Sequence, residues 1–302
     1  REIIQTMPQQ SAVMRMARRL PNMSRGKSRM PVLTGLITAY FVDGDTGLKQ
    51  TAKLQWQNKF IEAAELAVIV PIPEAVLDDQ DYDIWGEVRP ALSEAFSVAI
   101  TAAVLYGTNI PASWTVSLGA AGLFARATAA GHVVSAANYA DLYEAIMGET
   151  NAGVGGLFMA LEADGFMHTG HIGSAAMRGR LRNVRDINGV PLFVRSMQDT
   201  VRYELDGSPI YFLTDGTVID ATSYMFTGDW TQLVYAFRQD ITYKLFDQAV
   251  IQDQAGNIVY NLAQQDMVAL RAVMRLGWAL PNPINRMNAN AVTRLPFAVL
   301  TA

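Results

Sequence analysis

Residues 83–107 read DIWGEVRPALSEAFSVAITAAVLYG, and no other segment of the chain carries a stronger helix signal. Apolar side chains recur there at steps of three and four and form one stripe, made of Trp85, Val88, Leu92, Phe96, Ala99 and Ala103. This spacing predicts a long amphipathic helix within 74–106. Asp83 suits its N-cap, Gly107 suits the stop after it, and Pro90 should bend it.

Composition and length limit the class of protein. The chain has 302 residues, of which 50% are hydrophobic and 17% are charged, and it contains no cysteine. A chain of this length and apolar content can bury a substantial core as one large or two modest domains, which excludes wholesale disorder. The lack of cysteine excludes disulfides, thiolate catalysis and Cys-ligated metal sites.

The longest uncharged run covers residues 95–125. Residues 108–111 (TNIP) divide it into two apolar pieces, and each is shorter than the roughly 20 residues that span a bilayer. No secretory signal opens the sequence, because its first residues are basic and interrupted. We therefore expect a soluble protein with no membrane span.

Two strand-like runs, 33–42 and 48–70, flank the turn signal DGDTG at 43–47. Together they predict a long β-hairpin. An isolated two-stranded hairpin is marginally stable in water, so this one should need packing from elsewhere. Either a neighbouring subunit or a later strand of the same chain could supply that packing.

Charge is distributed unevenly along the chain. Residues 1–30 hold seven basic residues and one acidic residue, a balance of +6, so the net charge of −4 leaves −10 on the remainder. A basic arm on an acidic body suggests docking on another surface or on nucleic acid, although a solvated tail gives the same pattern. The arginine at position 1 fits either a protease-cut precursor or an incompletely resolved N-terminus.

Short helices and strands alternate beyond residue 131. Helices are predicted at 138–147, with Asn138 as the N-cap, and at 174–182. Strand signals cover 155–161, 191–194, 210–213, 233–238, 241–251, 258–262 and 267–280, and the turn at 253–257 should close a hairpin. In the last run the even positions are all apolar while Arg271 and Arg275 share the odd face, which predicts a strand buried on one side.

No segment carries a defensible active site. His168 and His171 lie among glycines with no third ligand or general base, so solvated loop histidines are the favoured interpretation. The glycine-rich run 151–156 lacks the residues of a phosphate loop, and the acidic run 78–83 lacks the spacing of a calcium loop. We predict no catalytic residue, cofactor or metal; a metal hydrolase built on the two histidines and a monomeric binding module are the alternatives from other classes.

The order of these elements and several strings resemble the major capsid proteins of tailed bacteriophages. The strings are 67–77 (AVIVPIPEAVL), 83–90 (DIWGEVRP), 102–107 (AAVLYG), 181–191 (LRNVRDINGVP), 228–230 (GDW), 238–242 (RQDIT), 266–275 (DMVALRAVMR) and 297–300 (FAVL). The similarity covers roughly residues 60–302, and the arm is less recognisable.

This resemblance implies an α+β fold divided into six segments. These are an N-terminal arm (1–33), an extended β-hairpin loop (34–67), a peripheral domain with a long spine helix (68–131), an axial α/β domain (132–235), further peripheral strands (236–282) and a C-terminal strand that returns to the axial domain (283–302). The implied protein is structural, not an enzyme.

The resemblance also implies partners. Copies of the chain should self-assemble into pentamers and hexamers of an icosahedral head around double-stranded DNA, which they bind without sequence choice. The resemblance implies that the head is assembled in the host cytoplasm and becomes part of the virion. Assembly involves a portal, a scaffold or maturation protease and, in some heads, a decoration protein. An encapsulin-like cellular compartment is the alternative within this fold.

Inter-subunit contacts are expected from the arm, the hairpin and the odd face of the last long strand. The candidates are Arg15, Arg18, Arg19, Asp43, Asp45, Lys49, Lys53, Lys59, Arg271 and Arg275. Some members of the family join a hairpin Lys to a neighbour's Asn in an isopeptide bond promoted by a Glu. Alignment of the closing strands places Asp266 and Val273 at those two positions, so we predict a non-covalent shell.

Overall fold

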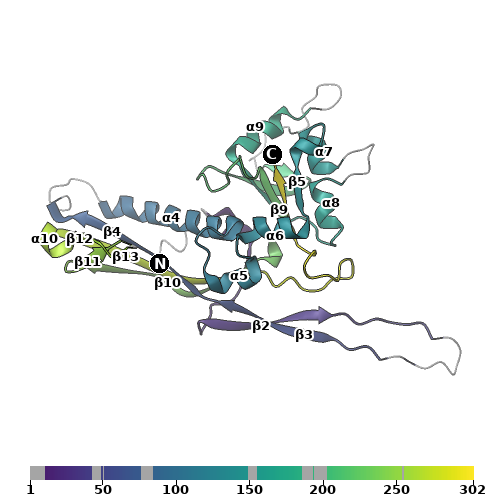
Figure 1. The fold of residues 1–302 in the computed structure, drawn as a ribbon, viewed down its shortest axis with the longest axis horizontal. Coiled ribbons are helices and arrows are strands. Elements are labelled where there is room, and N and C mark those ends of the chain that lie inside the picture. Colours follow the sequence, from purple (N-terminus) through teal and green to yellow (C-terminus); the bar gives the residue numbers. More distant parts are fainter. Residues whose placement is uncertain are drawn as a thin grey trace.

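The computed structural model describes residues 11–42, 49, 51–75, 84–148, 155–185, 193, 203–253 and 255–302. Figure 1 shows three parts: a long sheet with helix α4 lying along it, a second sheet flanked by helices, and a two-stranded hairpin that runs away from both. This mixture of helices and strands confirms the predicted α+β class.

The long sheet has four strands in the order β1-β10-β13-β4. Their bounds are Arg18–Arg19 (β1), Val234–Phe246 (β10), Met267–Ala279 (β13) and Ala64–Pro73 (β4). Strand β13 pairs antiparallel with β10 and β4, whereas β1 pairs with β10 in parallel. The two long strands β10 and β13 therefore form the centre of the sheet, with the shorter β1 and β4 at its edges.

Helix α4, Ile84–Tyr106, confirms the predicted long helix. Gly107 follows it with a φ of 70°, the left-handed conformation expected of a residue that ends a helix. The predicted N-cap, Asp83, lies outside the described residues. The helix lies along the long sheet in Figure 1, so it covers one face of that sheet.

One hydrophobic core joins α4 to this sheet. Phe96 of α4 and the even-numbered Met274 and Trp278 of β13 are buried in it together. The odd positions Arg271 and Arg275 are exposed on the opposite face. Successive side chains of a strand point to opposite faces, so the strand and its buried even face are confirmed, but the odd face is exposed only at the two arginines, because Ala269 and Val273 on it are buried as well.

The hairpin consists of β2, Lys27–Gly35, and β3, Gln55–Glu62, paired antiparallel with Lys27 opposite Glu62. The hairpin itself is confirmed, but its predicted strands, 33–42 and 48–70, are wrong in their bounds. The chain leaves the hairpin at Ala63 and enters the long sheet as β4, so the second predicted strand is two strands in different sheets. The turn signal at 43–47 lies outside the described residues.

The second sheet has six strands in the order β5-β14-β9-β6-β8-β7. Their bounds are Val133–Ser135 (β5), Phe297–Thr301 (β14), Met225–Gly228 (β9), Gly170–Ser174 (β6), Ser208–Leu213 (β8) and Glu204–Leu205 (β7). Helices α7, Leu142–Met147, α8, Leu157–Glu162, and α9, Ala175–Asn183, contribute buried residues to a second core on this sheet.

Short elements complete the described part of the chain. They are α2 (Ala12–Met16), α5 (Ala112–Leu118), α6 (Gly122–Ala130), α10 (Leu262–Gln265), the 3-10 turns Ala136–Asn138 and Trp230–Gln232, and the strands β11 (Val250–Gln252) and β12 (Ile258–Asn261). Strands β11 and β12 pair antiparallel, which confirms the hairpin predicted around 253–257. None of the described helices is long and apolar enough to cross a membrane.

Several local predictions differ from the structure. The run 155–161 is not a strand, because residues 157–162 form α8; a short apolar run fits a buried helix equally well. Helix α7 begins after Asp141, whose carboxylate accepts from the main-chain N–H of Glu144 at 2.9 Å, so Asn138 is not its N-cap. The helix predicted at 174–182 is confirmed as α9, and most of 191–194 lies outside the described residues.

Candidate inter-subunit surfaces

The hairpin presents apolar side chains that its own chain does not cover. Along β3 and the segments beyond the paired strands, large hydrophobic residues are exposed at Ile37, Tyr40, Phe41, Val42, Leu54, Trp56 and Phe60. Phe41 is fully exposed and Trp56 is 62% exposed. So many large apolar side chains exposed on one hairpin indicate a site of association, so the hairpin is the first candidate contact surface.

A loop between β13 and β14, residues 280–296, holds the base of the hairpin. Lys59 of β3 donates from Nζ to the carbonyl oxygen of Pro281 at 2.5 Å, and the main-chain N–H of Ile284 donates to the carbonyl of Leu33 at 3.1 Å. Burial is the main cause that lowers the pKa of Lys59. Lys59, one of the predicted contact residues, is therefore engaged within its own chain.

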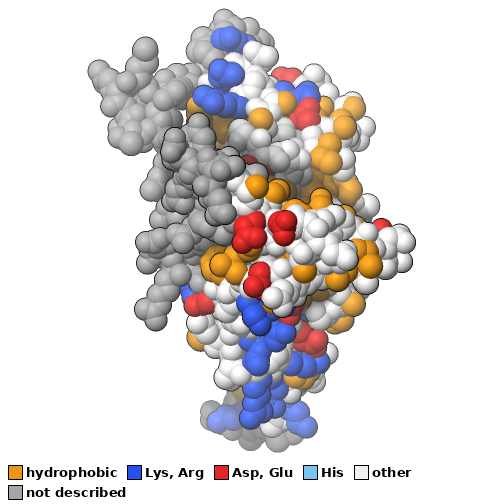
Figure 2. All heavy atoms as spheres, turned by 90° about the vertical axis from the view of Figure 1, so that its left-hand side faces the viewer, with side chains coloured by type: hydrophobic (Ala, Val, Ile, Leu, Met, Phe, Trp, Pro, Cys, Tyr) orange, Lys and Arg blue, Asp and Glu red, His pale blue; other side chains and the backbone are white. Residues whose placement is uncertain are grey.

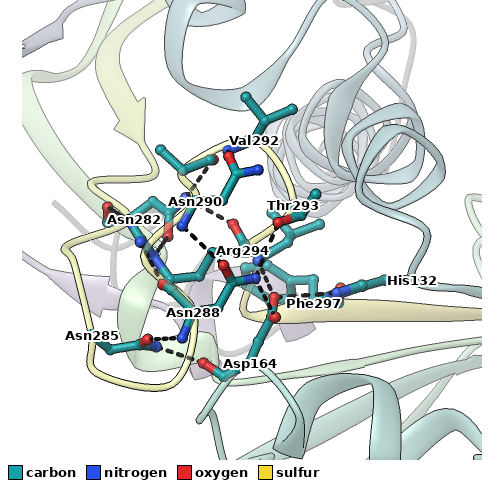
Figure 3. A network of polar contacts seen from close by, with 12 residues as sticks. His132, Asp164, Asn282, Asn285, Asn288, Asn290, Val292, Thr293, Arg294 and Phe297 are labelled. Carbon is teal, nitrogen blue, oxygen red and sulfur yellow. Dashed lines mark hydrogen bonds and ion pairs between the residues drawn. The ribbon is translucent and has the colours of Figure 1, made fainter.

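The loop 280–296 is fixed in turn by a buried polar network (Figure 3). Arg294, which is 2% exposed, donates from Nε to the side-chain oxygen of Asn282 at 3.1 Å and from a terminal nitrogen to the carbonyl of Asn288 at 2.8 Å. Burial lowers the pKa of Arg294, and the charge of Asp164 opposes that shift. These bonds satisfy a guanidinium that burial would otherwise penalise.

Asp164 lies at the other side of this network, after the end of α8. Its carboxylate accepts from the main-chain N–H of Leu295 at 2.8 Å and from the side-chain amide of Asn288 at 2.7 Å. The same carboxylate lies 3.2 Å from Nε2 of His132. The network therefore ties the second sheet and its helices to the loop that carries the hairpin.

The basic arm runs along the edge of the long sheet. Arg18 and Arg19 are exposed in β1, beside β10, and the guanidinium of Arg19 lies over the ring of Phe237. Arg15 is exposed on α2, with its guanidinium 5.5 Å from the ring centroid of Tyr211. Figure 2 views the molecule from the left-hand side of Figure 1, and on that end Lys and Arg side chains gather in a band on the lower half, with Asp and Glu side chains near the middle.

The open face of the long sheet carries a second group of cations. Arg275 is paired with Glu65 of β4 at 2.6 Å. Arg271 instead stands directly opposite Lys244 of β10, and both are exposed. The predicted contact residues Arg271 and Arg275 thus lie on the same face of β13, but Arg275 is next to a carboxylate and Arg271 is next to another cation.

The remaining predicted contact residues lie in the distal hairpin. Lys49 and Lys53 are exposed, and Asp43 and Asp45 lie outside the described residues. Sequence reasoning missed Lys244, because only the register of β10 against β13 places it beside Arg271. It also missed the loop 280–296, whose several asparagines and turn-like composition were a signal that could have been noticed.

The prediction that His168 and His171 are solvated loop residues is wrong for His171, whereas His168 does lie outside the helices and strands, although its side chain is only 8% exposed. His171 belongs to β6 and is fully buried; its ring contacts Thr227 Oγ1 at 3.0 Å and the carbonyl oxygen of Leu205 at 3.1 Å. Burial, followed by the nearby charge of His168, lowers the pKa of His171 to about 4. The glycines that suggested a loop instead let β6 pack closely between its neighbours.

Within the described part of the chain, no group of three or more His, Asp or Glu side chains lies close enough together to bind a metal ion. A cavity of about 810 Å³ lies between the arm and the second sheet, lined by Arg15, Arg178, Tyr203, Tyr211 and others. Among the described residues that line it, none is a carboxylate or histidine that could act as a general base beside a nucleophile.

Known proteins share this arrangement. The sequence profile of the Phage capsid family matches residues 1–285. A solved chain from Microbacterium phage Oxtober96 is 33% identical, covering 96% of this chain and 90% of that one with a TM-score of 0.79. A solved chain from Mycobacterium phage Adephagia is 30% identical, covering 96% and 89%, with a TM-score of 0.78.

A curated relative agrees with these structures. The major capsid protein of Staphylococcus phage 80alpha is 27% identical over 243 residues, which are 79% of this chain and 67% of that protein. These relatives favour a phage shell over the encapsulin-like alternative. The chain therefore belongs to the phage capsid family, and it is a major capsid protein of the tailed-phage type and part of the virion.

Proposed function

We propose that copies of this chain assemble into pentamers and hexamers that close an icosahedral head around double-stranded DNA, and that no covalent bond joins them. The observation that carries this proposal is the hairpin, whose exposed apolar side chains include Trp56 and Phe60. Two strands alone bury too little surface to be stable in water. Packing on another copy supplies the burial that the chain lacks.

The charge distribution supports a shell that holds DNA without binding it tightly. Phosphate attraction is independent of sequence, and the −10 charge outside the first 30 residues limits it. We propose that the chain acts without catalysis, assembles in the host cytoplasm, and meets a portal, a scaffold or maturation protease, and in some heads a decoration protein.

We also propose the six-segment division given by the resemblance, with the arm at 1–33 and the extended loop at 34–67. The long sheet with α4 corresponds to the peripheral segments, and the six-stranded sheet to the axial segment. The early start of β2, at Lys27, favours moving the boundary between arm and loop toward the N-terminus.

Electron microscopy and sizing chromatography of the purified chain test the proposal. The wild-type chain should form capsomers and closed shells. Trp56→Ser should reduce assembly strongly while leaving the thermal stability of the monomer within the error of the wild type, because this side chain is 62% exposed. Val116→Ser, which changes an exposed side chain on α5, is the matched control. A wild-type chain that stays a compact monomer at every concentration contradicts the proposal.

A further inference from the structure

The cavity of about 810 Å³ between α2 of the arm and the second sheet has a one-sided charge. Its described lining residues belong to α2, α9 and β8 or lie directly beside β7 and β8, and two of them are cations, Arg15 and Arg178. None of these lining residues is acidic. The cavity therefore concentrates positive charge in a chain whose net charge is −4, so it favours an anion.

Helix α2 is packed firmly on the second sheet, so Arg15 has a fixed place at the cavity. Met14 is 2% exposed and belongs to the core that also contains Ile172 of β6. A Cβ at Gly170, the first residue of β6, would lie 2.7 Å from Sδ of Met16, which shows how closely the helix approaches the strand. The fold itself therefore brings the two arginines to one cavity from segments far apart in the sequence.

Each arginine lies over an aromatic ring of the same cavity. The guanidinium carbon of Arg15 is 5.5 Å from the ring centroid of Tyr211, and that of Arg178 is 4.9 Å from the ring centroid of Tyr203. Contact with a ring orients a guanidinium but leaves its in-plane N–H groups available as donors. Such donors act in pairs, in a fork that matches the oxygens of a phosphate or a carboxylate.

Arg178 also has a donor that the described residues do not use. Its Nε is buried and has no hydrogen-bond partner among them. The next arginine of α9 differs, because Arg180 is paired with Asp220 at 2.5 Å. A buried donor without an acceptor costs free energy, so an anion that enters the cavity gains a hydrogen bond that the chain alone does not satisfy.

We propose that this cavity binds phosphate groups of the backbone of the packaged DNA through Arg15 and Arg178. A duplex presents phosphates whatever its sequence, which suits a shell that must hold any part of a genome. It follows that α2, α9 and β8 face the interior of the head, and that Arg15 serves nucleic acid, one of the two partners that a basic arm suggests. This inference rests on the proposed function and names the place where the shell touches its DNA.

Binding of a short labelled duplex to the purified full-length chain tests this site, with fluorescence anisotropy recorded over a series of salt concentrations. Arg15→Gln with Arg178→Gln should weaken binding at low salt at least about tenfold and lower the slope of log K against log salt by about 2, because two phosphate contacts are lost. The loss should be the same for AT-rich and GC-rich duplexes, because phosphates carry no sequence information. Inorganic phosphate should compete with the duplex on the wild-type chain.

Arg182→Gln with Arg185→Gln is the matched control. It removes the same charge from two exposed arginines near the cavity that are not among its described lining residues. The slope should change by less than about half as much as in the cavity variant. Arg178→Lys should keep the slope but weaken binding, because lysine keeps the charge and loses the fork.

Circular dichroism of each variant checks that the fold persists, and electron microscopy checks that shells still form. If the double variant does not fold, Arg15→Gln carries the test, because this side chain is exposed and its loss should lower the slope by about 1.

Each result decides the question. No binding of the duplex by the wild-type chain, unchanged binding by the cavity variant, or an equal loss in the control overturns the site while the proposed function stands. Binding of polyglutamate or of inorganic phosphate alone, without an effect of the two arginines on DNA, assigns the cavity to another anion and overturns it. Loss of shells in a folded cavity variant assigns the cavity to contacts between copies and also overturns it. Failure of the wild-type chain to assemble contradicts the proposed function instead.

Discussion

Asp164 shows how one buried carboxylate determines the position of a distant surface. It accepts hydrogen bonds from Leu295 and Asn288, and its charge acts on the buried Arg294 of the same loop. A buried charge is tolerated only when it is paired and hydrogen-bonded, so the loop 280–296 has little freedom. Because this loop holds the base of the hairpin through Lys59, the direction of the hairpin depends on residues far away in sequence.

Removing the charge of Arg294 should destabilise the chain strongly. Arg294→Met leaves the side-chain and carbonyl oxygens of Asn282 and the carbonyl oxygen of Asn288 without the donors that Arg294 supplies, which we expect to cost about 3 kcal/mol in the free energy of unfolding. Urea denaturation of the monomer measures it. Arg286→Met is the matched control, because Arg286 donates a single bond of 2.8 Å at an exposed site and should cost less than about 1 kcal/mol. Equal losses in the two variants would contradict the role of the network.

His171 should make the stability of the monomer depend on pH. Its pKa is about 4 in the folded chain, against 6.5 for a solvated histidine, so between these values the unfolded chain binds more protons. The free energy of unfolding should therefore fall as the pH falls from 6.5 to 4, by up to about 3 kcal/mol. Denaturant titrations at several pH values measure this slope.

The variant His171→Gln separates this contribution from that of the carboxylates. This variant should be less stable than the wild type at pH 7. Its free energy of unfolding should fall less between pH 6.5 and pH 4, because the contribution of His171 is missing. His168→Gln is the control and should keep most of the slope, because burial is a larger cause of the pKa shift than the charge of His168. A wild-type slope in His171→Gln would show that the histidine does not titrate as proposed.

At the scale of elements, the crossing of the hairpin over β13 depends on one glycine. A Cβ at Gly277 would lie 2.7 Å from the carbonyl oxygen of Glu62 and 2.9 Å from a side-chain carbon of Ile61, at the end of β3. The main chain of β3 cannot move away without disturbing its pairing, so a side chain has no room there. The close approach of the end of β3 to Gly277 allows the chain to pass from the hairpin into β4.

Gly277→Ala should therefore destabilise the monomer, by about 1–3 kcal/mol in the free energy of unfolding. Gly179→Ala is the matched control, since Gly179 lies inside α9 and a Cβ there meets nothing within 4 Å. That substitution should stabilise the chain by about 0.5–1 kcal/mol, because alanine favours a helix. Thermal unfolding of both variants checks the opposite signs, and a stabilised Gly277→Ala would refute the crowded crossing.

Elements with a strong local period could be predicted from the sequence, and those defined by tertiary contacts could not. The steps of three and four predict α4, and the alternation of 267–280 predicts β13. The apolar run 155–161 carries no period, so its helix follows only from packing on the second sheet. The division of 48–70 between two sheets likewise depends on β13 pairing with β4, which residue type does not reveal.

The candidate contact surfaces follow the same rule. Arg271 and Arg275 could be predicted as contact residues because they share one face of a single strand. Lys244 could not, because only the pairing of β10 with β13 places it beside Arg271. His171 was misjudged because glycines on either side suggest a loop, although β6 buries it between β8 and β9. Local sequence thus reveals neither the burial of a side chain nor the residues that it contacts where both depend on strand pairing.

At the scale of the whole molecule, the proposed assembly joins the exposed hairpin of one copy to a different surface of the next copy. Such a contact uses two different surfaces, so it repeats from copy to copy and ends only where a ring closes. Individually modest interfaces can then add up to a durable particle, because every further copy engages more than one neighbour. Covalent links between subunits are not required for that durability.

The assembled particle should accordingly come apart into single chains when it is boiled in detergent. Lys59 is held by the carbonyl oxygen of Pro281, and the position that the resemblance assigns to a promoting Glu is Val273, an apolar residue that is 9% exposed. An isopeptide bond to Asn forms when the lysine displaces the nitrogen of the Asn side-chain amide. Asp266 has a carboxylate at that position, so it has no such nitrogen to release. A denaturing gel of purified particles should show one band at the mass of the chain, with intact particles confirmed by microscopy before boiling. A ladder of higher masses that survives boiling would show that another lysine, such as the exposed Lys49 or Lys53, forms the bond.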